Sequence, residues 1–380
     1  MDATGKTATN HLLSQAISRR AFGRIAVLAT AGATLPFYNE AALAQLSNVG
    51  PIPKDAVKIN ANENPLGPCP EAAEAIYKVV RKGGRYLYEE TSVFVKTQAA
   101  IDNVKPEYIL PFAGSSDPLH RAVIAFTSPT KSFVMADPGY EAGARAAEFI
   151  KAKVCKIPLA KDHSHNARAM ATADANAGLI YICNPNNPTG TLTSRADIEY
   201  VLANKPKGSI LLLDEAYIHL SADGPCSDLV AADKDIIILR TFSKLYGMAG
   251  LRAGCAIGRP DLLEKLKPYG AGALPVTGMV GATASLNVKS LVPERRKLIK
   301  DVREDVFSFL HKNNFAFVPS DSNCFMLDAK RPAKELITAM QKEKVYIGRV
   351  WPAWPTHARI TVGTRDEMAK FKTALLKVMA

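Results

Sequence analysis

The middle of the chain alternates between short apolar runs and longer stretches in which apolar residues recur at helical spacing. The runs are YILPFA (108–113), SFVMAD (132–137), AKVCKIPL (152–159), GLIYICNP (178–185), SILLLDEAY (209–217), DIIILRTFS (235–243) and RAGCAIG (252–258). Because they are continuously apolar rather than alternating, they predict strands buried on both faces. Such strands separated by helices are typical of an α/β domain with a mostly parallel sheet, whose ligands bind at the carboxyl ends of the strands.

Helical patterns flank these runs. A helix is predicted from Glu71 to Lys82, ending at two glycines, and Ser194 with Asp197 forms a capping box that opens another. Beyond about Leu291 the pattern changes to a long charged helix, then FAFVPSDSNCFMLD, a helix from about Ala333 and the strand-like ARITVG. The predicted organisation is an irregular, proline-rich arm (45–70), a large domain (71–290) and a smaller α+β domain (291–380).

Residues 1–44 have the features of an export signal. The segment SRRAF (18–22) is followed by an apolar run from Ile25 to Phe37 that is too short to form a stable membrane anchor, and then by Ala42-Leu43-Ala44. An ordinary amphipathic helix would not explain paired arginines, apolar run and small-x-small site in this order. We therefore predict a twin-arginine signal peptide cleaved after Ala44, recognition by the twin-arginine export machinery, and a periplasmic or exported protein. Because that route carries folded proteins, a cofactor would be acquired before export.

Composition narrows the function only slightly. The chain has 380 residues, 47% of them hydrophobic, and a formal net charge of +12, which favours anionic ligands weakly. Basic residues are interspersed with acidic ones, so no nucleic-acid-binding arm is expected. The six cysteines form no CxxC or Cys/His cluster, so no metal site is expected. We expect the cysteines to be buried free thiols.

One lysine lies where a buried strand is expected to end. Lys244 follows the run DIIILRTFS, and Arg252 lies eight positions further on. Burial and neighbouring cations lower the pKa of a lysine, which allows it to act as a nucleophile or base. A solvated loop lysine is the commoner fate of a lysine taken alone. The functional interpretation therefore depends on its neighbours.

A glycine and hydroxyl side chains suggest a phosphate site. Gly114, Ser115 and Ser116 form a turn before a predicted helix, where backbone amides can approach an anion. Such turns are common, and alone this one is a weak signal. Thr241, Ser243 and Arg252 would add hydroxyls and a cation, and the six residues together predict a phosphate cup.

Polar residues at other strand ends suit a heteroaromatic ring. Asp214, at the end of SILLLD, could pair with a protonated ring nitrogen, although a structural salt bridge is an equal alternative. Tyr217 and Asn187 could bind a phenolic oxygen of the same ring. Tyr140 could stack on its face, with a core aromatic as the alternative. The set converges on a phosphorylated pyridine aldehyde.

The ordered motifs NENP, AGSSD, DPGY, NPNNPTG, DEAY, TFSKLYGMAGLRAG and RITVGT resemble fold-type I pyridoxal 5′-phosphate (PLP) aminotransferases, most closely the histidinol-phosphate aminotransferase family. The resemblance covers residues 55–380. It implies a three-layer, aspartate aminotransferase-like large domain with a smaller α+β domain. It also implies PLP as cofactor and a homodimer.

The resemblance assigns roles position by position. It makes Lys244 the Schiff-base lysine and Asp214 the partner of the pyridinium nitrogen. Asn187 and Tyr217 match the residues that bind the ring's O3′, and Tyr140 matches the stacking aromatic. The phosphate cup matches Gly114, Ser115, Ser116, Thr241, Ser243 and Arg252.

Four further residues match substrate or interface positions. Arg359 matches the arginine that binds the α-carboxylate, for which a planar bidentate donor is suited. Asn64 matches an arm asparagine over the site, and Arg349 is a second candidate substrate contact. Tyr86 resembles a tyrosine that reaches the phosphate of the neighbouring subunit's cofactor, although Leu87 replaces the usual proline.

The predicted function is transamination between an L-amino acid and a 2-keto acid, with Lys244 moving the α-proton. A decarboxylase or amino-acid oxidase would use the same scaffold and residues. An exported solute-binding protein without catalysis is a more distant alternative. Export argues against a role in histidine biosynthesis, and the sequence does not identify the amino donor.

Overall fold

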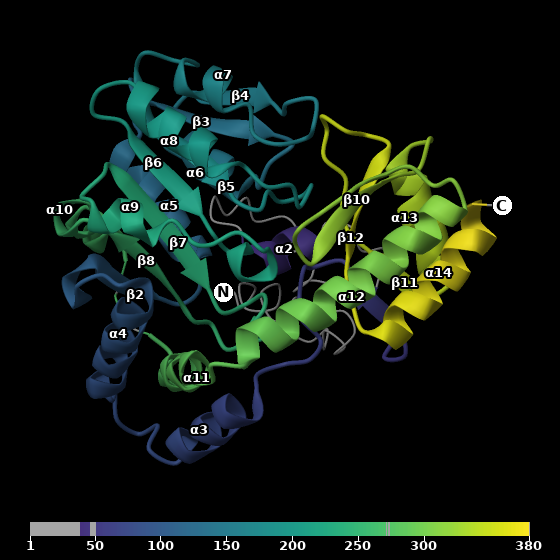
Figure 1. Cartoon of the computed structure of the whole chain (residues 1–380), viewed down its shortest axis with the longest axis horizontal. Helices are drawn as coiled ribbons and strands as arrows, with labels where there is room; N and C mark the ends of the chain where they lie inside the picture. The colour runs from purple at the N-terminus through teal and green to yellow at the C-terminus, as the bar shows by residue number, and fades with distance from the viewer. Residues whose placement is uncertain (1–38, 46–50, 271, 273, 380) are drawn as a thin grey trace, which may run out of the picture. The chain divides into compact units, whose positions relative to one another are not determined.

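A seven-stranded sheet organises most of the chain (Figure 1). The computed structural model describes residues 39–45, 51–270, 272 and 274–379. The strands are β2 (Ile109–Phe112), β3 (Ser132–Asp137), β4 (Val154–Pro158), β5 (Ala177–Cys183), β6 (Ile210–Asp214), β7 (Ile236–Thr241) and β8 (Gly254–Gly258). Their order is β2-β8-β7-β6-β5-β3-β4, parallel from β4 to β7, with β8 antiparallel to both of its neighbours. All seven predicted strands and the mostly parallel sheet are confirmed.

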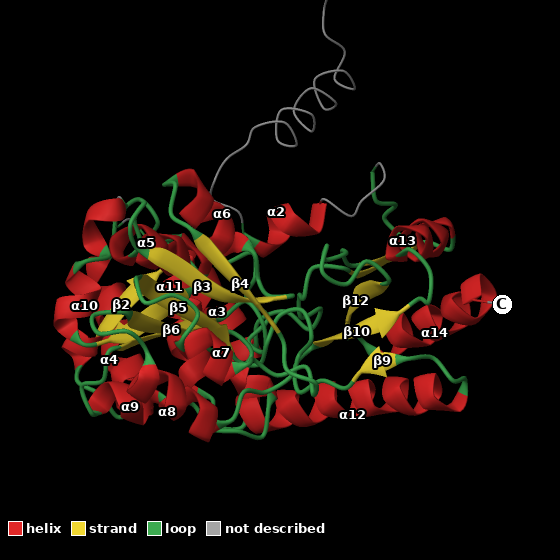
Figure 2. Cartoon of the chain, turned by 90° about the horizontal axis from the view of Figure 1, so that it is seen from above, coloured by secondary structure: helices red, strands yellow, loops and turns green. Residues whose placement is uncertain are grey.

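Helices cover both faces of this sheet. They are α3 (Pro70–Val80), α4 (Tyr88–Asp102), α5 (Ser116–Phe126), α6 (Ala142–Phe149), α7 (Ala167–Ala171), α8 (Arg195–Asn204), α9 (Ser227–Ala231), α10 (Pro260–Glu264) and α11 (Val276–Asn287), with short 3-10 helices η1 (Pro106–Tyr108), η2 (Ile218–Leu220) and η3 (Lys267–Tyr269). Figure 2 shows α5 and α6 on one side of the strands and α8 and α9 on the other. Every residue of β5, β6, β7 and β8 is buried, as the continuous apolar runs required.

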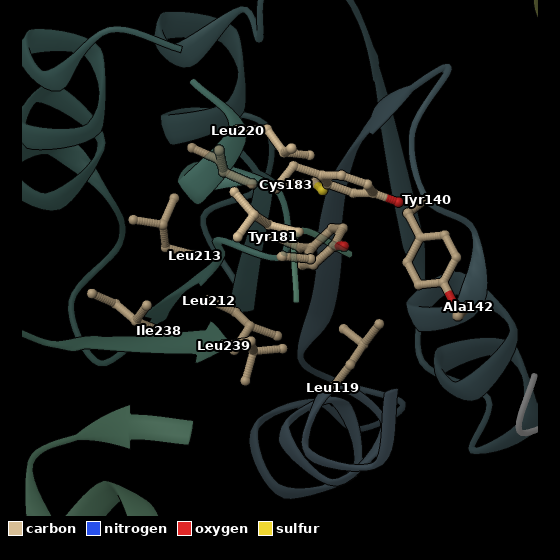
Figure 3. Packing of buried hydrophobic residues seen from close by; sticks show 14 of the residues in the cluster. Leu119, Tyr140, Ala142, Tyr181, Cys183, Leu212, Leu213, Leu220, Ile238 and Leu239 are labelled. Atoms are coloured by element: carbon tan, nitrogen blue, oxygen red, sulfur yellow. The ribbon is translucent and has the colours of Figure 1, made fainter. Parts of the chain in front are cut away.

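The core between sheet and helices is built from large apolar side chains. Leu119 of α5 and Ala142 of α6 pack in one cluster with Leu212 and Leu239 of the central strands (Figure 3). Ser194 caps the helix as predicted, since its hydroxyl accepts a hydrogen bond from the Asp197 amide at 3.1 Å, while the Asp197 carboxylate accepts from the same hydroxyl at 2.7 Å. Capping and burial therefore fix α8 as the sequence pattern predicted.

The C-terminal part contains two small sheets. Strands β9 (Phe317–Val318), β10 (Cys324–Asp328) and β12 (His357–Thr361) are antiparallel, and β1 (Val57–Ile59) pairs in parallel with β11 (Val345–Ile347). The helices are α12 (Leu291–Lys312), α13 (Ala333–Lys342) and α14 (Arg365–Met379). The long charged helix and the helix from Ala333 are confirmed. The arm is not wholly irregular, because β1 buries Val57 and Ile59 and joins the arm to the C-terminal part.

Only the end of the predicted signal peptide lies within the described residues. The paired arginines and the whole apolar run from Ile25 to Phe37 lie outside them. Residues Glu40–Gln45 form helix α2, whose start is capped by the Asn39 side chain accepting from the Ala42 amide at 2.9 Å. Leu43 and Ala44 are buried, so the predicted cleavage site lies in a helix packed against the rest of the protein. No helix in the described part of the chain is both long and apolar enough to cross a membrane.

A buried ion-pair network fastens β6 and β7 to α4. Arg240 donates from Nε to Glu215 Oε2 at 2.9 Å, and its Nη2 lies 3.2 Å from Asp102 Oδ1. Glu215 also accepts from the Cys226 amide at 2.8 Å, and Asp102 accepts from the Ser227 hydroxyl at 2.8 Å. Since all three charged side chains are buried, loss of one would leave uncompensated charge in the core.

We expect Arg240→Ala to lower the free energy of unfolding by about 3–5 kcal/mol, because two buried carboxylates would lose their cation. Urea denaturation followed by circular dichroism measures this change. The control is Arg195→Ala, which breaks the exposed pair with Asp228 and should change stability by less than about 1 kcal/mol. Equal effects of the two substitutions would contradict the assignment of Arg240 as a structural anchor.

Candidate active site

A cavity of about 250 Å³ lies at the carboxyl ends of the central strands. Its lining contains ten of the residues predicted from the sequence: Ser115, Ser116, Tyr140, Asn187, Asp214, Tyr217, Thr241, Ser243, Lys244 and Arg252. The register of the sheet explains this convergence, because Cys183 of β5 pairs with Asp214 of β6, which pairs with Leu239 of β7. The loops that follow these strands therefore begin at one edge of the sheet.

Lys244 is a buried lysine. It follows β7, and its Nζ donates a hydrogen bond to the Asn62 carbonyl at 3.0 Å and lies 5.4 Å from the centre of the Tyr217 ring. Burial lowers the pKa of the Lys244 amine; the charge of Glu40 opposes this effect and that of Arg359 adds to it. The structure thus gives Lys244 the environment expected of a nucleophile or base rather than of a solvated loop residue.

Asp214 is a buried carboxyl at the end of β6. Its Oδ2 accepts from the Tyr181 hydroxyl at 2.9 Å and its Oδ1 from the Ala216 amide at 3.1 Å. Burial raises the pKa of Asp214 to about 6, although both hydrogen bonds and the charge of Lys244 act to lower it. No cation is paired directly with Asp214 among the described side chains. A protonated ring nitrogen in the cavity would supply that charge.

Amide and aromatic groups surround the Tyr217 hydroxyl. It accepts from Asn62 Nδ2 at 3.1 Å and from Asn187 Nδ2 at 3.4 Å. Tyr140 lines the same cavity, and burial raises the pKa of its phenol, which keeps it neutral. These groups can bind a ring hydroxyl and offer an aromatic face to a planar ligand.

The predicted phosphate cup is assembled at the start of α5. Thr241 Oγ1 donates to Ser243 Oγ at 3.0 Å, and Arg252 Nη1 lies within hydrogen-bonding distance of Ser243 Oγ at 3.3 Å. Gly114 has φ +93°, and a Cβ there would lie only 2.3 Å from Arg252 Nη2. Glycine at this position therefore lets the guanidinium approach the turn. Hydroxyls, a cation and the N-terminus of an 11-residue helix form a donor set that fits a phosphate.

Two buried arginines lie beside this cavity. Arg359, on β12, donates from Nη1 to Asn187 Oδ1 at 2.8 Å and from Nη2 to the Asn60 carbonyl at 2.9 Å. Arg349 forms an ion pair with Glu141. Both guanidiniums lie over the Trp351 ring, at 5.4 and 4.6 Å from its centre. The structure thus brings Arg359 and Arg349 together at one end of the site.

Two predicted residues lie elsewhere. The Asn64 side chain donates to the Leu245 carbonyl at 2.8 Å and lines a neighbouring cavity. Asn62, rather than Asn64, is the arm asparagine that contacts Lys244 and Tyr217. Tyr86 is 80% exposed and stacks on Tyr88, so its reach into a neighbouring subunit stays a prediction.

Sequence reasoning missed Asn62, Tyr181 and Glu40. Asn62 lies two positions before Asn64 in the same motif, so the choice depended on how the arm turns. Tyr181 precedes Cys183 by two residues and therefore shares its face of β5, diagonal to Asp214, which a polar-tipped aromatic in an apolar strand could have indicated. Glu40 falls within the predicted signal peptide, where no site residue is expected. Among the described residues, no group of three or more histidine, cysteine or acidic side chains is placed to hold a metal ion.

Comparison with known proteins gives one consistent result. The family model described as "Aminotransferase class I and II" matches residues 54–375. The chain is 30% identical over 340 residues to the histidinol-phosphate aminotransferase of Moorella thermoacetica, covering 86% of each chain. It is also similar to a crystal structure of a putative histidinol-phosphate aminotransferase from Erwinia carotovora atroseptica, with TM-score 0.82, 30% identity and coverage of 87% and 98%.

A further solved structure agrees in fold. It is the histidinol-phosphate aminotransferase of Sinorhizobium meliloti in complex with pyridoxal-5'-phosphate, with TM-score 0.80, 24% identity and coverage of 90% of this chain and 95% of that one. The likeness extends to the aspartate aminotransferase of Thermus thermophilus at TM-score 0.74. The predicted aspartate aminotransferase-like fold is therefore confirmed.

The raised pKa of Asp214 should make the stability of the ligand-free protein depend on pH. The pKa of Asp214 is about 6 in the folded state and about 3.8 in the unfolded state, so protonation of Asp214 stabilises the folded state. This stabilisation is complete below pH 3.8 and is lost as the pH rises through 6. The free energy of unfolding of Asp214→Asn, relative to wild type, should therefore rise by about 1 kcal/mol between about pH 5 and 7.

Urea unfolding at several pH values measures this trend. Asp228→Asn is the control, because Arg195 holds the pKa of Asp228 below its ordinary value, and its relative stability should stay flat over the same range. A flat profile for Asp214→Asn as well would show that burial does not raise the pKa of Asp214.

Proposed function

Because the chain belongs to the class I and II aminotransferases, a family of PLP-dependent enzymes, we propose that Lys244, Asp214 and Arg359 carry amino-group transfer in the cavity described above. The observation that carries this assignment is that three groups surround one cavity: a lysine whose pKa is lowered by burial, a buried carboxyl without a directly paired cation among the described side chains, and a set of donors that fits a phosphate. Amino acids and 2-keto acids are the substrates of such enzymes. Membership of this family also rules out the solute-binding alternative.

The residues that hold PLP follow from the donor set. The cup of Ser115, Ser116, Thr241, Ser243 and Arg252 would bind its phosphate. When bound, the cofactor supplies a ring that accepts the electrons released as the substrate's Cα–H bond breaks.

Other side chains would bind the cofactor's ring. Asp214 would hold a proton on the ring nitrogen, because a cation there removes the penalty of its own buried charge. Tyr217 and Asn187 would bind the ring's hydroxyl oxygen, and Tyr140 would pack on the ring face.

Lys244 is the proposed proton carrier. Burial lowers its pKa, so a larger fraction of the amine is neutral near neutral pH than for an exposed lysine. A neutral Nζ can take the α-proton of the amino donor and later return it. Arg359 would bind the donor's carboxylate through a planar pair of N–H groups, and Trp351 against both arginines limits water there.

The identity of the amino donor is proposed only by class. An α-carboxylate suits Arg359, so we propose an L-amino acid donor with a 2-keto acid acceptor. Histidinol phosphate is the second candidate, suggested by the names of the relatives. Screening donors against one keto acid with product identification separates these. Release of carbon dioxide or peroxide instead of amino-group transfer would point to a decarboxylase or oxidase.

We expect Lys244→Ala to lower the rate of transamination at least about 1,000-fold, because it removes both the covalent anchor and the proton carrier. The wild-type protein should be yellow, with a visible band abolished by borohydride, and the variant should lack the borohydride-sensitive adduct. Lys205→Ala, which removes a lysine from the far end of α8, is the control and should retain full activity. Transamination at the wild-type rate by Lys244→Ala would refute the assignment.

We further propose that the enzyme works as a homodimer outside the cytoplasm. The exposed aromatic residues Tyr77, Tyr86 and Tyr88 on and beside α3 and α4 would suit an interface with a second copy. Export through the twin-arginine route would follow cofactor binding, because that route carries folded proteins.

The paired arginines provide the test of export. Replacing Arg19 and Arg20 by lysine keeps the charge but removes the guanidinium pair, and should leave the protein in the cytoplasm. Cell fractionation with an activity assay measures this outcome. Arg24→Lys is the matched control, and equal export of all three proteins would contradict the proposed route.

A further inference from the structure

One carboxylate of the chain itself contacts both active-site arginines, in addition to the ion pair between Glu141 and Arg349. Glu40, the first residue of α2, accepts from Arg359 Nη2 at 2.5 Å through Oε1. Its Oε2 accepts from Arg349 Nη2 at 3.3 Å and from Asn187 Nδ2 at 3.3 Å. Figure 1 shows α2 between the large sheet and strands β10 and β12, and Glu40 contacts a residue from each side: Asn187, which follows β5, and Arg359 of β12.

These contacts are those that a substrate carboxylate would make. Arg359 and Asn187 already share a hydrogen bond at 2.8 Å, so they present adjoining donors to one anion. The Nε atoms of Arg359 and Arg349 are buried and have no hydrogen-bond partner among the described residues. The arginines therefore retain unused donor capacity while a single carboxylate bridges them.

Glu40 also separates the arginines from the cavity. Asn39 and Glu40 line the cavity with Lys244, whereas Arg359 is completely buried and Arg349 is 4% exposed. A substrate carboxylate entering beside Lys244 would meet the carboxylate of Glu40 before it reached Arg359. Two like charges cannot share that position without a large repulsive cost.

The contact persists over the working pH range. Burial acts to raise the pKa of Glu40, but the charges of Arg359, Arg349 and Lys244 together lower it to about 2. Glu40 is therefore ionised at any pH suited to an assay, and acidification to pH 5 would not release it. Movement of α2 is the remaining way to free the arginines.

We propose that residues 39–45 are an intramolecular substrate mimic, in which the Glu40 carboxylate occupies the place of the substrate's anionic group. This proposal rests on the proposed role of Arg359 in binding that group. The uncleaved chain then binds anionic substrates only when α2 leaves the site. Because a tethered group has an effective concentration on the order of millimolar, it competes with free substrate without needing high intrinsic affinity.

The same helix carries the predicted cleavage site. Leu43 and Ala44 are buried while α2 is in place, so the bond after Ala44 becomes accessible only when the helix is displaced. Displacement would therefore expose the arginines and the bond together. Cleavage there would remove Glu40 from the chain and make the opening permanent.

Binding of succinate to the PLP-loaded full-length protein tests the proposal. Succinate carries carboxylates but no amino group, so it can bind without reacting, and isothermal titration calorimetry measures its Kd. We expect Glu40→Gln to lower this Kd at least about tenfold, because a neutral amide no longer competes for the arginines. Glu40→Asp, which keeps the charge but shortens the reach, should give an intermediate value.

Two further variants separate competition from general charge effects. Glu63→Gln removes a negative charge from the rim of the same cavity, and it should tighten succinate binding less than about twofold. Adding Arg359→Ala to Glu40→Gln should abolish the gain. An unchanged or higher Kd in Glu40→Gln, or an equal gain in Glu63→Gln, would overturn the proposal.

Succinate binding and amino-group transfer together distinguish a failure of the mimic proposal from a failure of the proposed function. If the succinate results hold but neither the wild-type protein nor Glu40→Gln transfers amino groups, the mimic stands and the assigned reaction is wrong. If both transfer amino groups with the same KM and bind succinate equally, the reaction stands and the mimic is wrong.

Discussion

The rest of the site depends on one constraint, which is that charged side chains of the large sheet and of β12 are buried around one cavity. Lys244, Asp214 and Arg359 are all buried, and each would be unfavourable there without partners. The partners come from segments far apart in the chain, including the arm, β5 and α2. The arm and the C-terminal part are therefore fastened to the large sheet where unpaired charge would otherwise be buried.

This constraint divides the site into two regions with different chemistry. Around Lys244 and Asp214, burial leaves a base with a lowered pKa and an acid with a raised one, which is the state that proton transfer requires. Around Arg359 and Arg349, Glu141 pairs with Arg349, so one guanidinium charge still requires an anion. Glu40 pairs with Arg359 and meets that requirement, and under our proposal it controls access to the site while Lys244 and Asp214 carry the chemistry.

Much of this architecture could be predicted from the sequence, because continuous apolar runs indicate strands that are buried on both faces of a sheet. All seven strands of the large sheet were identified in this way, and the polar residues that end them converge on one cavity. Strand β1 was missed because three residues give too short a pattern. Asn62 and Tyr181 were missed because their roles depend on how the arm folds back and on the register between neighbouring strands.

The register of β5, β6 and β7 also limits how the protein can change. Because successive side chains of a strand point to opposite faces, inserting one apolar residue between Ile210 and Leu213 would turn Asp214 away from the cavity while leaving the strand just as apolar. Apolar residues within these strands can be exchanged for others of similar volume, but the number of residues between the loops cannot change. For this enzyme, the length of these strands is therefore a stricter requirement than their sequence.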